Sequence, residues 1–246
     1  MEKTQETEQI TLRHQAEALT SLAQDIGTEP DLAKIVQRVT DVATSLSGAR
    51  FGAFFYNVQT AEGESYQLYT ISGVPREAFS KFPMPRKTAI FHPTFSGEEI
   101  VRSDDITKDK RYGQSPPHFG MPKGHLPVRS YLAIPVKNKH GEVFGGLLFG
   151  HEESGVFTEE SEKFGVAVAS LAAVAIENAT VQQKLRESEQ RLHLAAEATG
   201  LGTWDFNPIT GDLIWSERTK EVFGLSQDVK ASYQVFLQCI HPEDRK

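Results

Sequence analysis

The sequence predicts an α+β fold in which helices flank an antiparallel sheet, followed by a long helix and a second, smaller region. Two observations predict this fold class. Segments with helical spacing precede and follow short β-prone segments that are joined by turn residues. From residue 164 to residue 195, residues also recur at alternating spacings of three and four, which is the a/d pattern of a coiled coil. We therefore expect helices on one face of a sheet and one long helix that leads out of the domain.

The first two helices are predicted from apolar residues at helical spacing. One covers about residues 5–26, with Leu19 and Leu22 on the same side. The next begins after the break at Glu29-Pro30-Asp31. It ends at Gly48, because glycine readily adopts the left-handed conformation that terminates helices.

Four β-prone segments are predicted to form two antiparallel hairpins. They occupy residues 51–58, 66–71, 129–136 and 143–150. Glu62-Gly63 supplies the turn of the first hairpin, and Asn138 with Gly141 suits the turn of the second. Between the hairpins, residues 74–128 are rich in Pro, Gly, Lys and Asp and show little periodicity. Long irregular segments in compact domains are usually functional, so we expect a lid or a pocket wall here.

The long helix is predicted to begin at the N-cap Thr158, with Glu159 and Glu160 in its first turn, where carboxylates favour the positive helix end. We call its a/d positions the seam: Phe164, Ala167, Leu171, Val174, Asn178, Val181, Leu185, Ser188, Leu192 and Ala195. We expect the first half of the seam to pack on the sheet. From Asn178 onward only the seam is apolar, which favours a parallel homodimer through Asn178, Val181, Leu185 and Leu192. A buried Asn at an a position fixes the register of such a dimer.

A second region begins after a change of composition at Thr199-Gly200. Short strands are expected at residues 203–207 and 213–216. A region of this size has a marginal core, so we expect it to be part of a larger domain. The predicted organisation is a helix at 1–26, a domain at 27–180, a coiled-coil linker at 181–195 and a partial domain at 196–246.

Composition excludes several classes of protein. The net charge of −7 argues against general binding to nucleic acid or anionic membranes. The apolar run from Phe164 to Ile176 is too short to span a bilayer and is broken by Ser170, and the first residues lack a signal-peptide core. Cys239 is the only cysteine, which excludes an internal disulfide, dithiol redox chemistry and a multi-cysteine zinc site. These observations predict a cytoplasmic protein.

Five sequence stretches carry a resemblance to a known family. They are Val101–Gly113, Gly120–Pro122, Gly124–Val136, Gly141–His151 and Phe157-Thr158. Together they resemble the GAF domain of bacterial sensor kinases, over roughly residues 10–180. The resemblance implies a sensory domain with a GAF-type antiparallel sheet.

The second region is similar to the first half of a PAS domain. The matching stretches are Leu194–Phe206, Trp215-Ser216, Val222–Gly224 and His241–Arg245. A GAF domain followed by a PAS domain implies the input half of a histidine kinase, with a downstream kinase domain and a response regulator as partners. A diguanylate cyclase is the alternative owner of such an input pair. A dimerisation scaffold without any small ligand is the competing class of function.

A ligand pocket is expected between the sheet and the irregular segment, for a small molecule that the sequence does not identify. Its candidate lining is Phe54, Tyr56, Tyr69, Asp105, His118, Arg129, Tyr131 and Phe149. Arg129 is suited to pair with a ligand carboxylate or phosphate through its planar guanidinium. The alternative is a structural ion pair between Arg129 and Asp104 or Asp105.

The resemblance also implies which ligand chemistries to test. Covalent attachment of a bilin needs a cysteine, and the GAF-like region contains none, so it is excluded there, as is reduction of methionine sulfoxide. The signature of cyclic-nucleotide-binding members is matched by Asn138, Lys139, Phe157 and Glu162. However, Ser161 replaces its Asp, which weakens that interpretation.

Catalytic and metal-binding residues are not predicted. The histidines of the GAF-like region lack the spacing of a metal site, and only non-covalent haem through one of them stays open. His193 lacks the acidic and Pro neighbours of a phosphoacceptor. Gly145-Gly146 lacks the Lys-Ser/Thr of a phosphate-binding loop. We therefore expect no catalytic residue in this chain.

Overall fold

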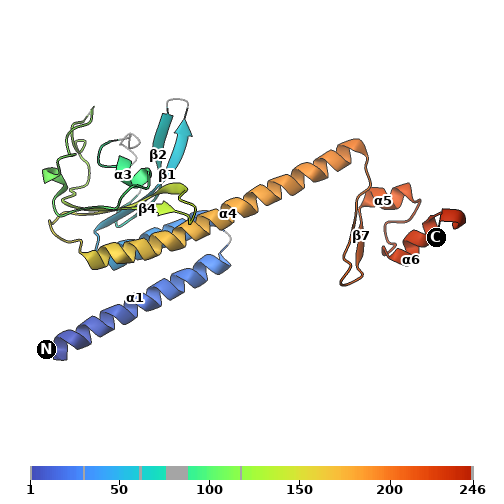
Figure 1. The fold of residues 1–246 in the computed structure, drawn as a ribbon, viewed down its shortest axis with the longest axis horizontal. Helices are drawn as coiled ribbons and strands as arrows, with labels where there is room; N and C mark the ends of the chain where they lie inside the picture. Colours follow the sequence, from blue (N-terminus) through green and yellow to red (C-terminus); the bar gives the residue numbers. More distant parts are fainter. Residues whose placement is uncertain (1, 30, 61–62, 76–87, 117, 245–246) are drawn as a thin grey trace. The chain divides into compact units, whose positions relative to one another are not determined.

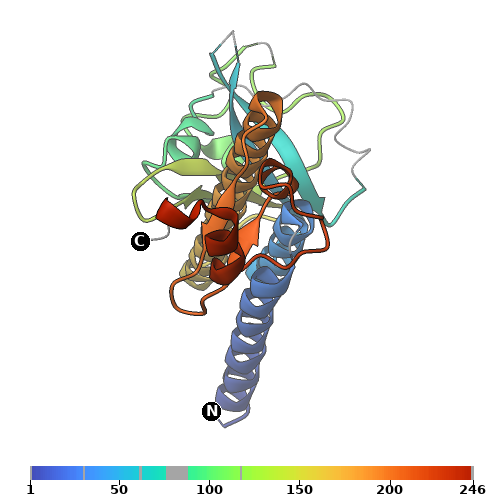
Figure 2. The same ribbon diagram turned by 90° about the vertical axis from the view of Figure 1, so that its right-hand side faces the viewer.

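The computed structural model describes residues 2–29, 31–60, 63–75, 88–116 and 118–244. It divides into two compact units, Met1–Thr180 and Val181–Lys246, which are considered separately below. Figures 1 and 2 show the ribbon in two views at right angles.

The first unit contains a five-stranded sheet in the order β2-β1-β5-β4-β3. The strands are β1 (Phe51–Thr60), β2 (Gly63–Ser72), β3 (Val101–Ser103), β4 (Ser130–Lys137) and β5 (Val143–His151). All neighbouring pairs are antiparallel. The two predicted hairpins are β1–β2 and β4–β5, so these strand pairings are confirmed. Glu62 of the predicted first turn lies outside the described residues. β3 was not predicted, because its three residues lie inside the irregular segment and form a short edge strand.

Three long helices belong to this fold: α1 (Glu2–Thr28), α2 (Leu32–Ser47) and α4 (Glu159–Thr199). The predicted limits of α2 are confirmed. The Asp31 carboxylate accepts hydrogen bonds from the backbone N–H groups of Ala33 and Lys34, and Gly48 adopts a φ of 74° at the C-cap. Thr158 begins α4 as expected, since its hydroxyl accepts a hydrogen bond from Ser161 N at 3.3 Å.

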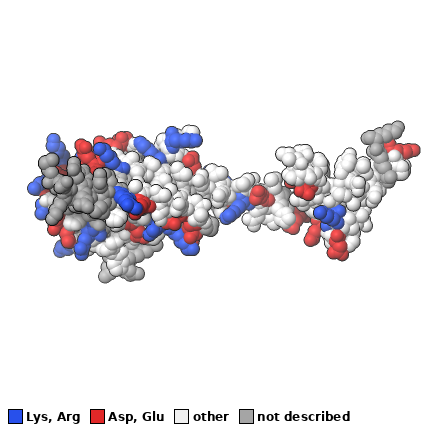
Figure 3. All heavy atoms as spheres, turned by 90° about the horizontal axis from the view of Figure 1, so that it is seen from below, with Lys and Arg blue, Asp and Glu red and all other residues white. Residues whose placement is uncertain are grey.

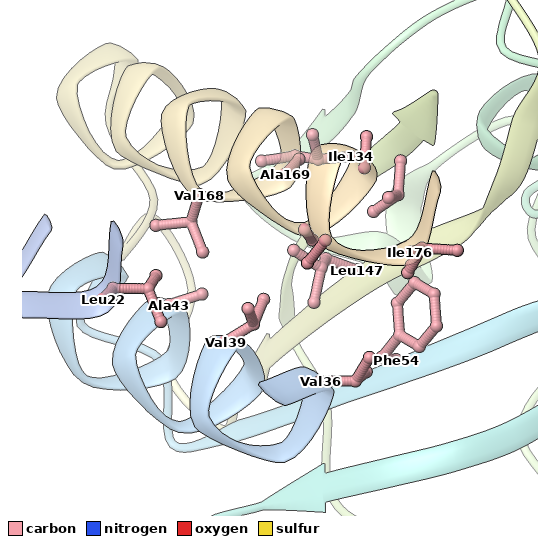
Figure 4. Packing of buried hydrophobic residues seen from close by; sticks show 14 of the residues in the cluster. Leu22, Val36, Val39, Ala43, Phe54, Ile134, Leu147, Val168, Ala169 and Ile176 are labelled. Carbon is pink, nitrogen blue, oxygen red and sulfur yellow. The ribbon is translucent and has the colours of Figure 1, made fainter. Parts of the chain in front are cut away.

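The helices cover one face of the sheet, and the short helix α3 (His92–Phe95) lies on the other face (Figure 1). Side chains alternate between these faces along each strand. Phe54, Ile134 and Leu147 point to the helices and join the main core with residues of α1, α2 and α4 (Figure 4). Leu132 and Phe149 belong to the same core. We call this side the helix face.

The other side of the sheet, which we call the loop face, carries a second set of apolar residues. Ala53 and Phe55 of β1 pack there against Phe95 of α3. Tyr131 and Ala133 of β4 pack against Val101 and Ile106, with Tyr112 and Met121 of the irregular segment beside them. The described part of the irregular segment therefore packs on the loop face.

The side of α4 that packs on the sheet is not the seam. Its buried residues are Gly165, Val168, Ala169, Ala172, Ala173, Ala175 and Ile176. At about 100° per residue, these positions are centred about 140° around the helix from the seam. Phe164, Ala167 and Leu171 are half-buried, Leu171 packs against the core, and Val174 is already 51% exposed. The first half of the helix thus packs on the sheet as predicted, but mainly through small residues beside the seam.

Among the described residues, α4 is also the one helix that is long and apolar enough to cross a membrane. Its most apolar stretch coincides with Val168, Ala172 and Ile176, which are buried in the core of the first unit. Core helices of soluble domains meet the same criterion, so this finding gives no support for a membrane span.

The second unit has a small core. β6 (Trp204–Phe206) and β7 (Leu213–Trp215) form an antiparallel pair, followed by α5 (Glu217–Val222) and α6 (Tyr233–Cys239). The Trp215 ring stacks on Phe223 at a centroid distance of 5.1 Å and meets Phe236 edge-on. Trp204 lies opposite Trp215 in register and is 68% exposed. The hairpin therefore has an apolar face that the described part of this unit covers only in part.

Charged side chains of both signs are interspersed on the face of the molecule that Figure 3 shows. A basic stripe of the kind that follows a nucleic-acid backbone is not seen there among the described residues. This agrees with the acidic net charge of the chain.

Candidate functional site

The candidate pocket residues are distributed over both faces of the sheet. Phe54 and Phe149 are buried in the main core on the helix face, and Tyr56 and Tyr69 pack beside them. The Tyr56 ring meets Phe54 and Tyr69 edge-on, at centroid distances of 4.8 and 4.9 Å. Burial, with a further contribution from Tyr69, raises the pKa of the Tyr56 hydroxyl. These four residues fill the space between sheet and helices.

The other candidates lie on or beside the loop face. Tyr131 is buried there, Asp105 and Arg129 form an ion pair, and His118 is exposed. Neighbouring residues of a strand point to opposite faces, so strand aromatics from both faces cannot line one cavity. The structure therefore brings together Asp105, Arg129 and Tyr131 and separates them from the four aromatic residues of the helix face.

Asp105 organises the beginning of the short 3-10 helix η2 (Ile106–Lys108). Its carboxylate accepts hydrogen bonds from Thr107 N at 3.2 Å and from Thr107 Oγ1 at 2.6 Å, and it pairs with Arg129 and Lys108. The hydrogen bond from Arg129, then that from Thr107, holds the pKa of this carboxyl well below its usual range. Arg129 thus adopts the structural pairing that the sequence offered as the alternative, with its side chain half exposed.

We predict that Asp105→Asn destabilises the first unit at pH 7 and that the deficit shrinks in acid. The folded-state pKa of Asp105 is lowered, so the unfolded state takes up the proton first as the pH falls. The stabilisation is therefore present above about pH 4, the ordinary Asp range, and is lost as the pH falls below it. Urea unfolding of both proteins at pH 7, 5 and 3 measures this.

The matched control for this prediction is Asp104→Asn. The Asp104 carboxylate forms no ion pair with any residue the structure describes. Its replacement should leave the urea midpoint nearly unchanged at every pH. Equal losses in both variants would contradict the role assigned to Asp105.

A second ion cluster lies on the same segment. The Arg111 guanidinium donates two hydrogen bonds to the Asp109 carboxylate, at 3.0 and 2.9 Å, and one to Glu99 at 2.8 Å. The hydrogen bond from Arg111 lowers the pKa of Asp109, and the one to Asp109 raises that of Arg111. This cluster ties residues 109–111 to the chain just before β3.

Two buried hydroxyl groups on the loop face have no hydrogen-bond partner among the described residues. They belong to Tyr131 on β4 and Thr94 on α3. Burial raises the pKa of the Tyr131 hydroxyl. Thr94 was not among the predicted site residues, because a single Thr in an irregular segment carries no pattern that marks it. Unpaired buried hydroxyls are costly. Tyr56 on the helix face carries one as well, so the loop face is the candidate ligand site because its unpaired hydroxyls lie under the irregular segment.

Glycines of β5 allow the cover to lie directly on the sheet. A Cβ atom at Gly146 would lie 3.1 Å from the Thr94 methyl group and 3.3 Å from the Phe95 ring. At Gly150 it would lie 2.9 Å from a methyl group of Val128. Gly146 therefore serves close packing of α3, and Gly145 serves close packing against Phe55 of β1.

A groove of about 570 Å³ lies elsewhere, between α4, the end of β4 and the residues before β3. Ile134, Ala169 and Ala173 belong to its apolar lining, and Lys139 and Glu177 are among its charged residues. The side-chain amide of Asn138 donates a hydrogen bond to Glu177 at 3.2 Å and thus connects the β4–β5 turn to α4.

The residues that match the cyclic-nucleotide signature have structural roles here. The Asn138 side-chain oxygen accepts hydrogen bonds from His140 N and Glu142 N within the turn, and Phe157 is buried in the core. Glu162 pairs with Arg102 of β3 at 2.9 Å, and Ser161 donates to Ser47 O. The described residues contain no group of three or more His, Cys, Asp or Glu side chains that could hold a metal ion.

These observations define an α+β domain with helices on one face of an antiparallel sheet and a ligand-site candidate under an irregular cover on the other. A family model described as GAF domain matches residues 29–177, which is more than half of the chain. The chain belongs to the GAF domain family, and the GAF domain is a sensory module.

Solved structures show the same fold. The GAF domain of the phosphoenolpyruvate-protein phosphotransferase from Acinetobacter superposes with a TM-score of 0.56 at 18% sequence identity. The match covers 68% of this chain and 95% of that one. At this identity, the likeness establishes the fold alone.

Two curated relatives match over short stretches. Sensor protein FixL from Bradyrhizobium diazoefficiens is 37% identical over 57 residues, which is 23% of this chain and 11% of FixL. The probable diguanylate cyclase DgcE from Escherichia coli is 35% identical over 66 residues, or 27% of this chain and 6% of DgcE. The chain thus matches only a small part of each relative's length.

Proposed function

We propose that this chain is the cytoplasmic input module of a bacterial sensor histidine kinase. In this proposal the GAF domain binds a small ligand or a partner on its loop face and passes the bound state through a dimeric α4 to a downstream kinase domain. That kinase domain would act on a response regulator. The stretch similar to FixL supports a kinase, and the stretch similar to DgcE keeps a diguanylate cyclase as the alternative.

The observation that carries this proposal is the two-sided character of α4. One side, between Gly165 and Ile176, is buried on the sheet, and the seam is centred about 140° away around the helix. Val181, Leu185 and Leu192 of the seam are 57–69% exposed in the single chain. A helix of 41 residues with an apolar stripe and polar flanks is suited to pair with a second copy of itself.

The second unit supports a PAS assignment for residues 196–246. Its two strands form a sheet with an incompletely covered apolar face, which includes the exposed Trp204. Further strands of the same domain would complete such a sheet. The linker at residues 181–195 would then join a GAF sensor to a PAS sensor.

The proposed relay is a shift of α4 on the sheet. The contact on the α4 side consists largely of small residues, such as Gly165, Ala169 and Ala173, which interlock little with the sheet. Two packings of α4 that differ by a small rotation would therefore be close in free energy. A ligand changes their ratio only through its different affinity for the two packings.

Native mass spectrometry of the full chain, purified from cells, tests for the ligand. Disulfide cross-linking then tests the relay, in a background in which Cys239→Ser removes the native thiol. We expect Val181→Cys to cross-link between two copies at a rate that changes when ligand is removed, and Gln190→Cys, on the opposite side of α4, to cross-link poorly. Equal cross-linking rates at both positions, or rates that do not change when the ligand is removed, would refute the relay. A protein free of any small molecule in repeated preparations favours the scaffold alternative.

A further inference from the structure

The unpaired hydroxyl of Tyr131 lies beside an aromatic side chain of the loop face. The ring of Phe91 meets the ring of Tyr131 edge-on at a centroid distance of 6.5 Å. The Tyr131 side chain is 7% exposed, so bulk water does not solvate it. A ligand group placed beside the Phe91 ring could therefore reach the Tyr131 hydroxyl.

The surroundings of this hydroxyl are apolar. Phe91 and Leu148 belong to both loop-face clusters, and Tyr112 and Met121 complete the contacts around Tyr131. The Tyr112 hydroxyl is already engaged, because it accepts a hydrogen bond from Met121 N at 3.1 Å. A ligand body in this place would contact rings and aliphatic side chains.

The cation nearest to the Tyr131 hydroxyl is already paired. Arg111 lies close enough to Tyr131 for its charge to act on the hydroxyl, yet its guanidinium is held by Asp109 and Glu99. An anion beside the Tyr131 hydroxyl would have to compete with these carboxylates for Arg111, and a cation there would lie among apolar side chains.

We propose that the ligand of this GAF domain is an uncharged molecule with an aromatic or aliphatic body and a hydrogen-bond acceptor for the Tyr131 hydroxyl. The inference rests on the proposed function, because it names the class of ligand for the site proposed there.

Three probes of similar size test the ligand class: acetophenone, which is uncharged and has a carbonyl acceptor, the anion benzoate and the cation benzylammonium. Saturation-transfer NMR and calorimetric titration of the full chain at pH 7 measure their binding. We expect acetophenone to bind at least about tenfold more tightly than either ion, which is about 1.4 kcal/mol. Tighter binding of benzoate or benzylammonium would overturn the ligand class and leave the proposed function standing.

Two matched variants test the assignment to Tyr131. Tyr131→Phe removes the loop-face hydroxyl, and Tyr56→Phe removes an equally unpartnered buried hydroxyl from the helix face. We expect Tyr131→Phe to weaken acetophenone binding about tenfold, the effect of one lost hydrogen bond, and Tyr56→Phe to leave it unchanged. Neither change removes an existing hydrogen bond of the folded chain, so both ligand-free variants should unfold at or above the wild-type temperature. Equal binding to both variants would overturn the role of Tyr131.

If none of the three probes binds, the ligand class is tested by identifying small molecules that co-purify with the full chain from cells. A co-purified molecule that is uncharged at pH 7 supports the ligand class, and an ionic one overturns it. The absence of any bound molecule, together with no binding of the three probes, overturns the proposed ligand sensing itself and the ligand class with it.

Discussion

Replacing Phe149 by Ala is expected to lower the free energy of unfolding of the first unit by about 3–5 kcal/mol, the usual cost of removing a buried ring from a core. Phe149 is 1% exposed and packs between the sheet and the helices. The deletion would leave a cavity that Leu132 and Val168 cannot fill without moving the helices. Urea unfolding followed by far-UV circular dichroism measures the loss.

The matched control is Phe119→Ala. Phe119 is 65% exposed, so its truncation should change the free energy of unfolding by no more than about 0.5 kcal/mol. The comparison also tests the function of Phe149, which the sequence suggested as a pocket residue. A variant that keeps its stability but loses ligand binding would show that Phe149 contacts the ligand, contrary to its position on the helix face.

The second large effect is expected in the seam. Leu185→Asp would place a carboxylate at an a position of the proposed dimer, where an unpaired buried charge costs several kcal/mol. We expect the dissociation constant of the dimer to rise by at least about 100-fold, since each 1.4 kcal/mol is a factor of ten. Analytical ultracentrifugation of the full chain over a range of concentrations measures the shift to monomer.

Gln190→Asp is the control for the seam. Gln190 is exposed on the side of α4 opposite to Leu192, so the same new charge there should leave the association unchanged. Circular dichroism of both variants shows whether α4 stays helical. A wild-type chain that is monomeric at high concentration, or equal dissociation by both variants, would rule out the dimer proposed here.

Much of the fold follows from local signals in the sequence. Asp31 and Gly48 delimit α2 because each satisfies a backbone requirement of a helix end. The two hairpins follow from β-prone runs around turn residues. β3 is different, because Val101–Ser103 is too short to show a period and is fixed only by its pairing with β4.

The buried side of α4 could not be predicted from apolar spacing. Spacing analysis responds to large residues such as Leu171 and Val174, whereas the side against the sheet is made of Gly and Ala with few larger residues. Those small residues are selected by close approach to the sheet: a Cβ atom at Gly165 would lie 2.1 Å from the Ile134 side chain. Such a constraint is visible only when the partner of the helix is known.

The candidate site also depends on tertiary contacts that the sequence does not reveal. A list of aromatic strand residues ignores that Phe54 and Tyr131 point to opposite faces, because the face depends on register and on which side the helices cover. The pairing of Arg129 with Asp105 was foreseen as an alternative, and the structure contains it. Thr94 acquires significance only through its burial without a partner.

α4 continues without a break from its buried part to Thr199. The number of residues after Ile176 therefore decides in which direction around the helix axis the later side chains point. Each residue added or removed there would turn the later part of the seam by about 100° relative to the helix side that packs on the sheet, and seven residues would nearly restore its phase. Natural variants of this region should therefore tolerate changes in steps of seven residues and few others. The length of α4 beyond the GAF domain would then differ among relatives by multiples of seven residues, whereas the distance that it spans would not be fixed.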